Sequence, residues 1–228
     1  MSPENDDETR SRHMRVAAPS PWVARFAHLI PAKGAVLDLA CGGGRNARFL
    51  RQRGHPVVAL DKDTAALTQD AASESSRHLY KGGGDSPAAP GIEIVQADLE
   101  IGAPVFDPPG PLGNRRFAGI VVVNYLYRPI LPKLTALLID GGVLLYETFA
   151  RGNERFTRPR NPDHLLRAGE LLDLARGQFQ IVAYEHGVVE ADPIPGVEQR
   201  LAAIKDLSNS KRDDCEPEPH PLAPVPPA

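Results

Sequence analysis

Carboxylates that accompany apolar runs are the residues of this chain best placed to bind a ligand. Asp38 lies in the apolar run of residues 35–39, and the glycine cluster of residues 42–44 follows it. Ala47 and Leu50 continue at helical spacing, so the stretch predicts a strand, a tight turn and a helix. Glycines let the backbone approach a bound molecule, and the first turn of a helix presents free N–H groups and a positive dipole end. We therefore expect the turn to hold a ligand.

The residues around the glycines narrow the choice of ligand. Gly42, Gly44 and Ala47 fit the loose dinucleotide fingerprint G-x-G-x-x-G/A. Asp38 disfavours a pyrophosphate, because a carboxylate would repel it, and favours the amino and sulfonium groups of S-adenosylmethionine. Asp61 ends the next apolar run, about 20 residues after the turn, where a carboxylate can accept both hydroxyls of a ribose. Both kinds of cofactor contain this ribose, so Asp61 does not choose between them.

Written as D-x-A-x-G-x-G, residues 38–44 resemble motif I of the class I S-adenosylmethionine-dependent methyltransferases. The stretch departs from the family at Ala40, where the family has its first glycine. We therefore expect a negative φ at Ala40 or a slightly looser turn. Residues 138–144, with their Gly-Gly pair, resemble the region after the motifs in this family. Across motif I, residues 60–62 and residues 149–162, the chain resembles the tellurite-resistance type of small-molecule methyltransferases.

The resemblance implies an α/β fold with a doubly wound, mostly parallel seven-stranded sheet in the order 3-2-1-4-5-7-6, the last strand antiparallel, and helices on both faces. It also implies that Asp98 hydrogen-bonds the adenine amino group and that Leu99 lines the adenine ring. The implied cofactor is S-adenosyl-L-methionine. The residues expected to bind it are Asp38, Ala40, Gly42, Gly44, Asn46, Asp61, Lys62, Asp98, Leu99 and Asn124.

Local signals predict the remaining elements. Ser20 is the expected N-cap, and Pro21 the first residue, of a helix that reaches residue 30. Trp22 in this helix is interpreted as a core anchor. Asp63 is expected to cap a later helix. The other expected helices cover residues 131–139 and 169–176. The other expected strands cover residues 55–61, 92–100, 117–124 and, after a Gly-Gly turn, 143–148, with a closing hairpin of residues 179–189 and 197–205.

Three residues are candidate catalytic bases: Tyr125, Glu147 and His164. A thiolate acceptor would need no base, whereas an oxygen or nitrogen acceptor would use one. Arginines in residues 149–162 either hold an acidic group of the acceptor or are solvated and paired with nearby acids. No cluster has the spacing of metal ligands, so we expect no metal site.

Composition sets the remaining expectations. The chain of 228 residues has a net charge of -3 and a pI near 6.2, so it has no electrostatic footprint for nucleic acid. The chain has two cysteines, and it shows no targeting segment and no apolar run of about 20 residues. We therefore expect a soluble cytoplasmic protein that does not bind membranes. We expect a flexible arm over residues 1–18, a methyltransferase domain over 19–207 and a disordered Pro-rich tail over 208–228.

The sequence thus predicts an S-adenosylmethionine-dependent methyltransferase (EC 2.1.1.-) that acts on an unidentified small acceptor by in-line displacement. A nucleic acid or protein acceptor and the oligomeric state stay open. One alternative is an NAD-dependent oxidoreductase, which would leave Asp38, Asp98 and the Gly-Gly pair unexplained. The other is a methyltransferase-fold binding protein without turnover, which the sequence does not separate from the enzyme.

Overall fold

The computed structural model describes residues 18–68, 91–102, 104–190 and 195–206, together with 214, 216, 217, 219 and 220. The expected arm and Pro-rich tail lie largely outside the described residues, so the domain boundaries at residues 18 and 207 stay predictions.

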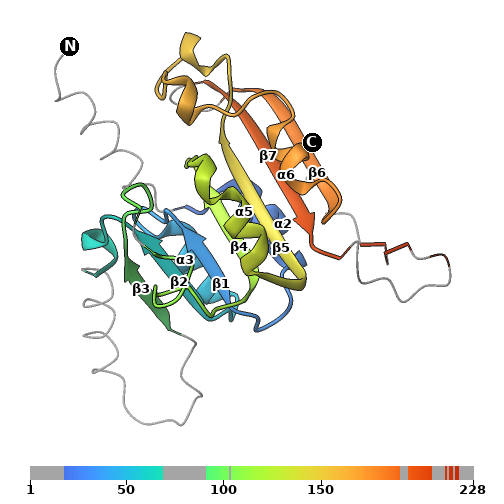
Figure 1. The fold of residues 1–228 in the computed structure, drawn as a ribbon. Helices are drawn as coiled ribbons and strands as arrows, with labels where there is room; N and C mark the ends of the chain where they lie inside the picture. Colours follow the sequence, from blue (N-terminus) through green and yellow to red (C-terminus); the bar gives the residue numbers. More distant parts are fainter. Residues whose placement is uncertain are drawn as a thin grey trace.

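A seven-stranded sheet in the order β3-β2-β1-β4-β5-β7-β6 organises the described chain, which confirms the predicted fold (Figure 1). The strands β3, β2, β1, β4 and β5 are parallel neighbours, and β7 runs antiparallel to both β5 and β6. The strands are β1 Val36–Leu39, β2 Val57–Asp61, β3 Ile92–Gln96, β4 Phe117–Val123, β5 Leu138–Phe149, β6 Gln180–Val189 and β7 Gly196–Ile204.

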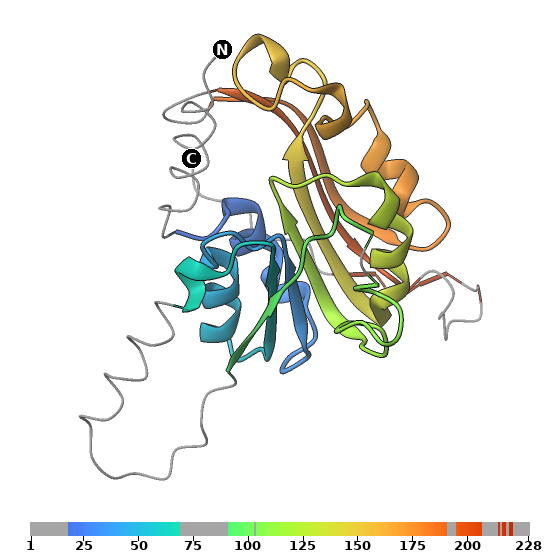
Figure 2. The same cartoon turned by 60° about the vertical axis from the view of Figure 1, so that its left-hand side comes forward.

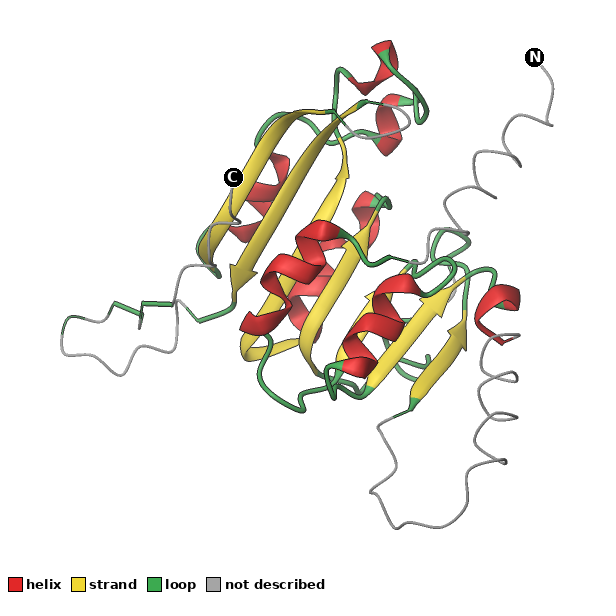
Figure 3. Ribbon diagram, turned by 180° about the vertical axis from the view of Figure 1, so that it is seen from behind, coloured by secondary structure: helices red, strands yellow, loops and turns green. Residues whose placement is uncertain are grey.

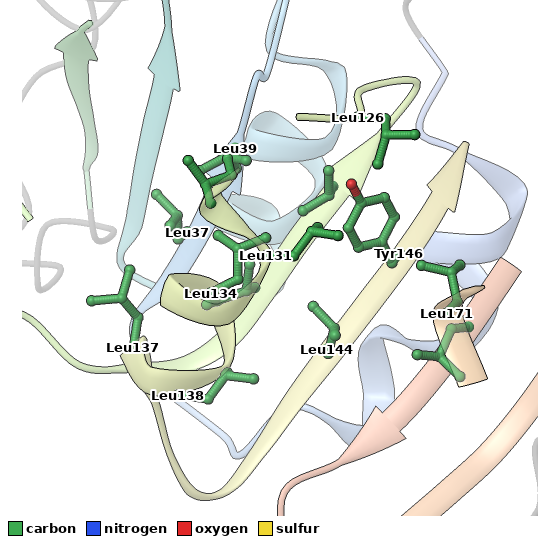
Figure 4. Packing of buried hydrophobic residues seen from close by; sticks show 14 of the residues in the cluster. Leu37, Leu39, Leu126, Leu131, Leu134, Leu137, Leu138, Leu144, Tyr146 and Leu171 are labelled. Carbon is green, nitrogen blue, oxygen red and sulfur yellow. The ribbon is translucent and has the colours of Figure 1, made fainter. Parts of the chain in front are cut away.

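Helices cover both faces of this sheet, because alternate strand residues point to opposite sides. On one face, α2 (Pro21–Phe26) and α3 (Arg45–Gln52) pack against Val36, Val121 and Leu145 (Figure 3). On the other face, α5 (Leu131–Leu137) and α6 (Glu170–Ala175) pack against the side chains of the intervening strand positions. In Figure 4 the leucines of α5 lie over Leu37, Leu39 and Leu144. The central strand β4 is buried along almost its whole length, as its continuous apolar run predicts.

The first helix is fixed by contacts that the sequence partly predicts. The Ser20 hydroxyl oxygen accepts the backbone N–H groups of Trp22 and Val23 at 3.1 and 3.2 Å, which confirms Ser20 as the N-cap. Trp22 is only 3% exposed, and its indole N–H donates to the carbonyl oxygen of Leu201 at 3.1 Å. Trp22 is therefore a core anchor that joins α2 to β7.

The Gly-Gly pair has a different role from the turn predicted for it. Helix α5 ends at Leu137, two residues earlier than predicted, and β5 begins at once with Leu138. Pairing with β4 shifts register between Leu138 and Val143, so the glycines form a bulge inside the strand, where Gly141 has a φ of +76°. The Gly141 N–H donates to the carbonyl oxygen of Lys205 at 2.7 Å, so the bulge stays hydrogen-bonded to the residue that follows β7.

The two halves of the sheet differ in length. β1, β2 and β3 contain four or five residues each, whereas β5, β6 and β7 contain 12, 10 and 9. Figure 2 shows the long strands curving past the short ones, with the loop after β5 at their far end. In the described part of the chain, no helix is long and apolar enough to cross a membrane.

Candidate active site

A cavity of about 250 Å³ lies at the carboxyl ends of β1, β2 and β4 and beside the residues that follow β3. Open α/β sheets bind ligands at this edge, where the strand order reverses. Its lining is Ala40, Leu60, Asp61, Lys62, Ala97, Asp98, Leu99, Glu100, Asn124 and Tyr125. The structure therefore brings together six of the expected cofactor-binding residues, Ala40, Asp61, Lys62, Asp98, Leu99 and Asn124, and the candidate base Tyr125.

Asp61 is held by two backbone N–H groups. Gly42 donates to Oδ2 at 2.8 Å, and Asp63 donates to Oδ1 at 3.0 Å. A carboxylate can accept about four hydrogen bonds, so each oxygen keeps a lone pair for a ligand hydroxyl. Asp63 in turn accepts the N–H of Ala65 at 3.2 Å, which confirms its capping role. The cavity thus presents an oriented carboxylate with two free acceptor positions.

The turn after β1 corrects the expectation for Ala40. This residue has a φ of +53°, the left-handed conformation that glycine adopts freely and alanine does not. Neighbouring hydrogen bonds hold it there, because the Cys41 N–H donates to the carbonyl oxygen of Leu60 at 3.0 Å and the Gly42 N–H donates to Asp61. After the adjacent strand β4, Asn124 also has a positive φ, +56°. Of the three non-glycine residues with positive φ in the described chain, two therefore line the cavity.

The two glycines expected to bind the cofactor have different surroundings. No atom lies within 4 Å of the position that a Cβ of Gly42 would occupy, so there is space for a ligand beside it. A Cβ on Gly44 would lie 2.2 Å from Cδ2 of Leu67. Gly44 therefore allows α3 to pack closely against the helical residues after Asp63.

Asp38 and Asn46 lie beneath the turn and do not line the cavity. Asp38 is 1% exposed, its Oδ2 has no hydrogen-bond partner among the described residues, and burial raises its pKa to about 7. The Ala47 N–H at the start of α3 offsets part of this effect by stabilising the carboxylate. Asn46 accepts the backbone N–H of Ser20 at 2.9 Å. It thus joins the first helix to the helix that follows the glycine turn.

Tyr125 lines the cavity next to Asn124. Glu100 lies near its hydroxyl; this lining residue was missed by the sequence analysis although it lies two positions after Asp98. Burial, and then the charge of Glu100, raise the tyrosine pKa, which keeps the hydroxyl protonated. The Tyr146 hydroxyl fixes the backbone here by donating to the carbonyl oxygen of Tyr125 at 2.8 Å. Tyr125 therefore presents a neutral hydroxyl beside Glu100 at this edge of the cavity.

Glu147 lies near the end of β5, on the face covered by α2. It is 7% exposed, and burial raises its pKa, while the nearby Ser20 hydroxyl acts in the opposite direction. Its carbonyl oxygen accepts the N–H of Asn124 at 2.9 Å, so the residue is bonded directly to the cavity wall.

His164 is exposed in the loop after β5, in the short helix η4 (Pro162–His164), and it does not line the cavity. Arg128, just after β4, ties this loop down by donating to the carbonyl oxygens of Asp163 and Leu165 at 2.7 and 2.8 Å. The same guanidinium forms a two-point ion pair with Glu170 at 2.7 and 2.9 Å. No signal in the sequence connects Arg128 to residues so far along the chain.

One arginine of the loop after β5 pairs with a nearby acid, as one of the two expectations for these arginines had it: Arg151 Nε lies 2.6 Å from Glu154 Oε1. Arg155 and Arg160 are exposed. No group of three or more histidine, cysteine or acidic side chains in the described residues could hold a metal ion.

Comparison with solved structures identifies the fold. TehB from Haemophilus influenzae superposes with a TM-score of 0.64 at 17% identity, over 88% of this chain and 66% of that one. The 1,6-didemethyltoxoflavin-N1-methyltransferase of Burkholderia thailandensis gives a TM-score of 0.55 at 19% identity, over 89% of this chain and 82% of that one. The [4+2]-cyclase SpnF gives 0.54 at 14% identity, over 81% and 78%. This chain thus spans just under two thirds of the Haemophilus protein's length.

The chain has the class I S-adenosylmethionine-dependent methyltransferase fold. It is TehB-like in particular, since residues 20–80 match the family model described as tellurite resistance protein TehB. No curated protein matches the chain in sequence. The matched segment contains α2 and the glycine turn, and it includes the cavity residues Ala40, Leu60, Asp61 and Lys62.

Proposed function

We propose that this protein is a methyltransferase that uses S-adenosylmethionine to methylate a small acceptor. The observation that carries the proposal is the Asp61 carboxylate, which is oriented by the N–H groups of Gly42 and Asp63 and keeps two acceptor positions directed to a cavity. Two adjacent hydroxyls of a ribose match such a carboxylate.

The residues present fit this cofactor. Asp61 would hold the ribose, Asp98 and Leu99 would hold the adenine, and the space beside Gly42 allows close approach to the turn. Asp38 lies under the turn, where its charge would favour the positive groups of the bound molecule through the electrostatic field and not through direct contact. When bound, the cofactor supplies a methyl group on a sulfonium. The chain contributes placement of the acceptor and exclusion of water.

A small acceptor is favoured by charge and by structural likeness. The acidic pI of about 6.2 gives no attraction to a polyanion. The similar Burkholderia methyltransferase is described with the small molecule 1,6-didemethyltoxoflavin and S-adenosylhomocysteine bound. The [4+2]-cyclase SpnF has a similar fold, so the fold alone does not define the reaction. Methyl transfer by this protein therefore has to be measured.

The test is transfer of labelled methyl from S-adenosylmethionine to pooled small metabolites and, separately, to total RNA and denatured protein. We expect label in the small-molecule pool. Label only in RNA or protein would refute the small acceptor but leave methyl transfer standing. Binding of S-adenosylhomocysteine without label in any pool would indicate a binding protein, and binding of NAD in its place would indicate an oxidoreductase.

A further inference from the structure

One side chain of the cavity joins two walls that are not neighbours in the sheet. The strand order places β2 and β1 between β3 and β4. Asp98, Leu99 and Glu100 follow β3, whereas Asn124 and Tyr125 follow β4, and all of them line the cavity. Glu100 and Asp98 nevertheless lie near enough to Tyr125 for their charges to act on its hydroxyl. The Tyr125 side chain therefore extends from the β4 wall across the cavity toward the β3 wall.

The backbone of Tyr125 is fixed on the β4 side. Asn124, the residue before it, has a φ of +56°, and its N–H donates to the carbonyl oxygen of Glu147 at 2.9 Å. The carbonyl oxygen of Tyr125 accepts the hydroxyl of Tyr146 at 2.8 Å, and Tyr146 is 1% exposed. Glu147 and Tyr146 both belong to β5, the next strand of the sheet. These two hydrogen bonds fix the point from which the ring extends over the cavity.

The surroundings of the ring are those of an aromatic binding surface. Tyr125 packs against the same buried apolar cluster as Ala97 and Leu99. It is only half-buried, so part of the side chain stays open to the cavity that it lines. An open aromatic ring binds a flat base by stacking, and this contact does not require a polar group on the ring. Tyr125 therefore offers a stacking surface on the side of the cavity where Leu99 lies.

The Tyr125 hydroxyl is poorly suited to the role of a general base. Burial, and then the charges of Glu100 and Asp98, raise the pKa of Tyr125, so the hydroxyl keeps its proton. A protonated phenol does not take a proton from an acceptor. The hydroxyl also lies beside Asp98, the residue assigned to adenine in the proposed function, whereas the transferred methyl group is bonded to the sulfonium on the other side of the ribose.

We propose that Tyr125 is a cofactor-binding residue that closes the cavity over the adenosine half of S-adenosylmethionine, and that it is not the base for the acceptor. This inference rests on the proposed methyltransferase function. Stacking uses the aromatic ring and not the hydroxyl. Phenylalanine should therefore replace Tyr125 in this role, whereas an aliphatic side chain should not.

The test is calorimetric titration of two probes, S-adenosylhomocysteine and 5′-methylthioadenosine, which contains the adenosine half without the amino-acid group. Tyr125→Leu keeps an apolar side chain against the buried cluster but removes the ring. It should weaken binding of both probes by about 10-fold or more, because each loses the same stacking contact. Tyr125→Phe should bind both within about threefold of the unsubstituted protein, because it keeps the ring.

The matched control is Tyr127→Leu. Tyr127 is also half-buried and packs against the same apolar cluster, but it lies outside the cavity lining. Tyr127→Leu should bind both probes as the unsubstituted protein does. Thermal unfolding confirms that each variant is folded. Unchanged affinity in folded Tyr125→Leu, or an equal loss in Tyr127→Leu, would overturn the assignment of Tyr125 while the proposed function stands.

Methyl transfer separates cofactor binding from base catalysis. With saturating labelled S-adenosylmethionine and the pooled small metabolites, Tyr125→Phe should keep the labelling seen with the unsubstituted protein. A Tyr125→Phe protein that binds S-adenosylhomocysteine normally but no longer transfers label would show that the hydroxyl acts on the acceptor, and it would overturn the inference. Failure of the unsubstituted protein to bind S-adenosylhomocysteine would refute the proposed function and this inference together.

Discussion

The parallel half of the sheet, β3-β2-β1-β4, and the antiparallel half, β5-β7-β6, organise polar groups in different ways. In the parallel half, backbone N–H groups of Gly42 and Asp63 orient Asp61, and the loops around the cavity adopt left-handed conformations at Ala40 and Asn124. In the antiparallel half, ion pairs between side chains orient the polar groups. Arg200 of β7 is one example, because its Nη2 lies 2.8 Å from Oε2 of Glu198 on the same strand.

This difference indicates how each half of the sheet should respond to substitution. A site made by backbone geometry tolerates many side chains around it but requires a fixed loop conformation. A site made by ion pairs changes its chemistry with a single substitution. We therefore expect the cavity to depend on loop conformation and on the Asp61 carboxylate, and the antiparallel half to depend on individual ion pairs.

The largest expected effect concerns the charge buried beneath the glycine turn. Because the pKa of Asp38 is raised from 3.8 to about 7 in the folded protein, the folded state binds a proton between these values that the unfolded state has lost. Stability should therefore fall as pH rises from about 4 to 7, by up to about 4 kcal/mol, and level off above that. Asp38→Asn should remove most of this fall and also weaken S-adenosylmethionine binding.

Urea unfolding at several pH values measures this effect, with Asp140→Asn at an exposed position as the control. The control should keep the pH dependence of the unsubstituted protein. A folded Asp38→Asn protein with an unchanged slope would show that the buried charge lies elsewhere in the parallel half.

A smaller loss is expected when the ion pair that joins the two halves, between Arg128 after β4 and Glu170 of α6, is broken. Arg128→Ala would leave Glu170 and two backbone carbonyls without their donor, and both partners are only about a quarter exposed or less, at 27% and 18% of their side chains. We expect a loss of about 2–3 kcal/mol in the free energy of unfolding. Arg176→Ala, which breaks a pair exposed to 79% and 69%, should cost less than about 0.5 kcal/mol. Equal losses of stability in the two variants would contradict the distinction between the partly buried and the exposed ion pair.

The smallest expected effect concerns the left-handed conformation of Ala40 in the parallel half. Ala40→Gly relieves a left-handed conformation that costs about 1–2 kcal/mol but adds about 0.4–1 kcal/mol of entropy to the unfolded chain. The variant should therefore be more stable by about 0.5–1 kcal/mol. Ala35→Gly, at a residue without positive φ, should be less stable. Thermal unfolding compares the two, and a destabilised Ala40→Gly protein would mean that the loop is not strained.

Local sequence signals predicted the parallel half well, because its chemistry is local. The cap at Ser20, the cap at Asp63 and the acid that ends β2 all follow from residue types at short spacing. The strand order came from the resemblance of motif I and residues 138–144 to a known family, and it is confirmed.

The remaining features depend on contacts that no local pattern encodes. The left-handed Ala40 is imposed by hydrogen bonds between the turn and β2, and the bulge at Gly141 by pairing with Lys205. The burial of Asp38 and of Glu147 depends on the tertiary packing of helices against the sheet. The ten residues expected to bind the cofactor and the candidate bases Tyr125, Glu147 and His164 stay predictions as to role.

Calorimetric titration of S-adenosylhomocysteine into the unsubstituted protein, Asp61→Ala and Asp63→Ala tests the central claim most directly. Asp61→Ala should weaken binding by about 1.5–3 kcal/mol, roughly 10- to 150-fold, because the hydrogen bonds to both ribose hydroxyls are lost. Asp63→Ala should bind within about threefold of the unsubstituted protein, since its backbone N–H still orients Asp61. Unchanged affinity in a folded Asp61→Ala protein would contradict the assignment of this cavity to the cofactor.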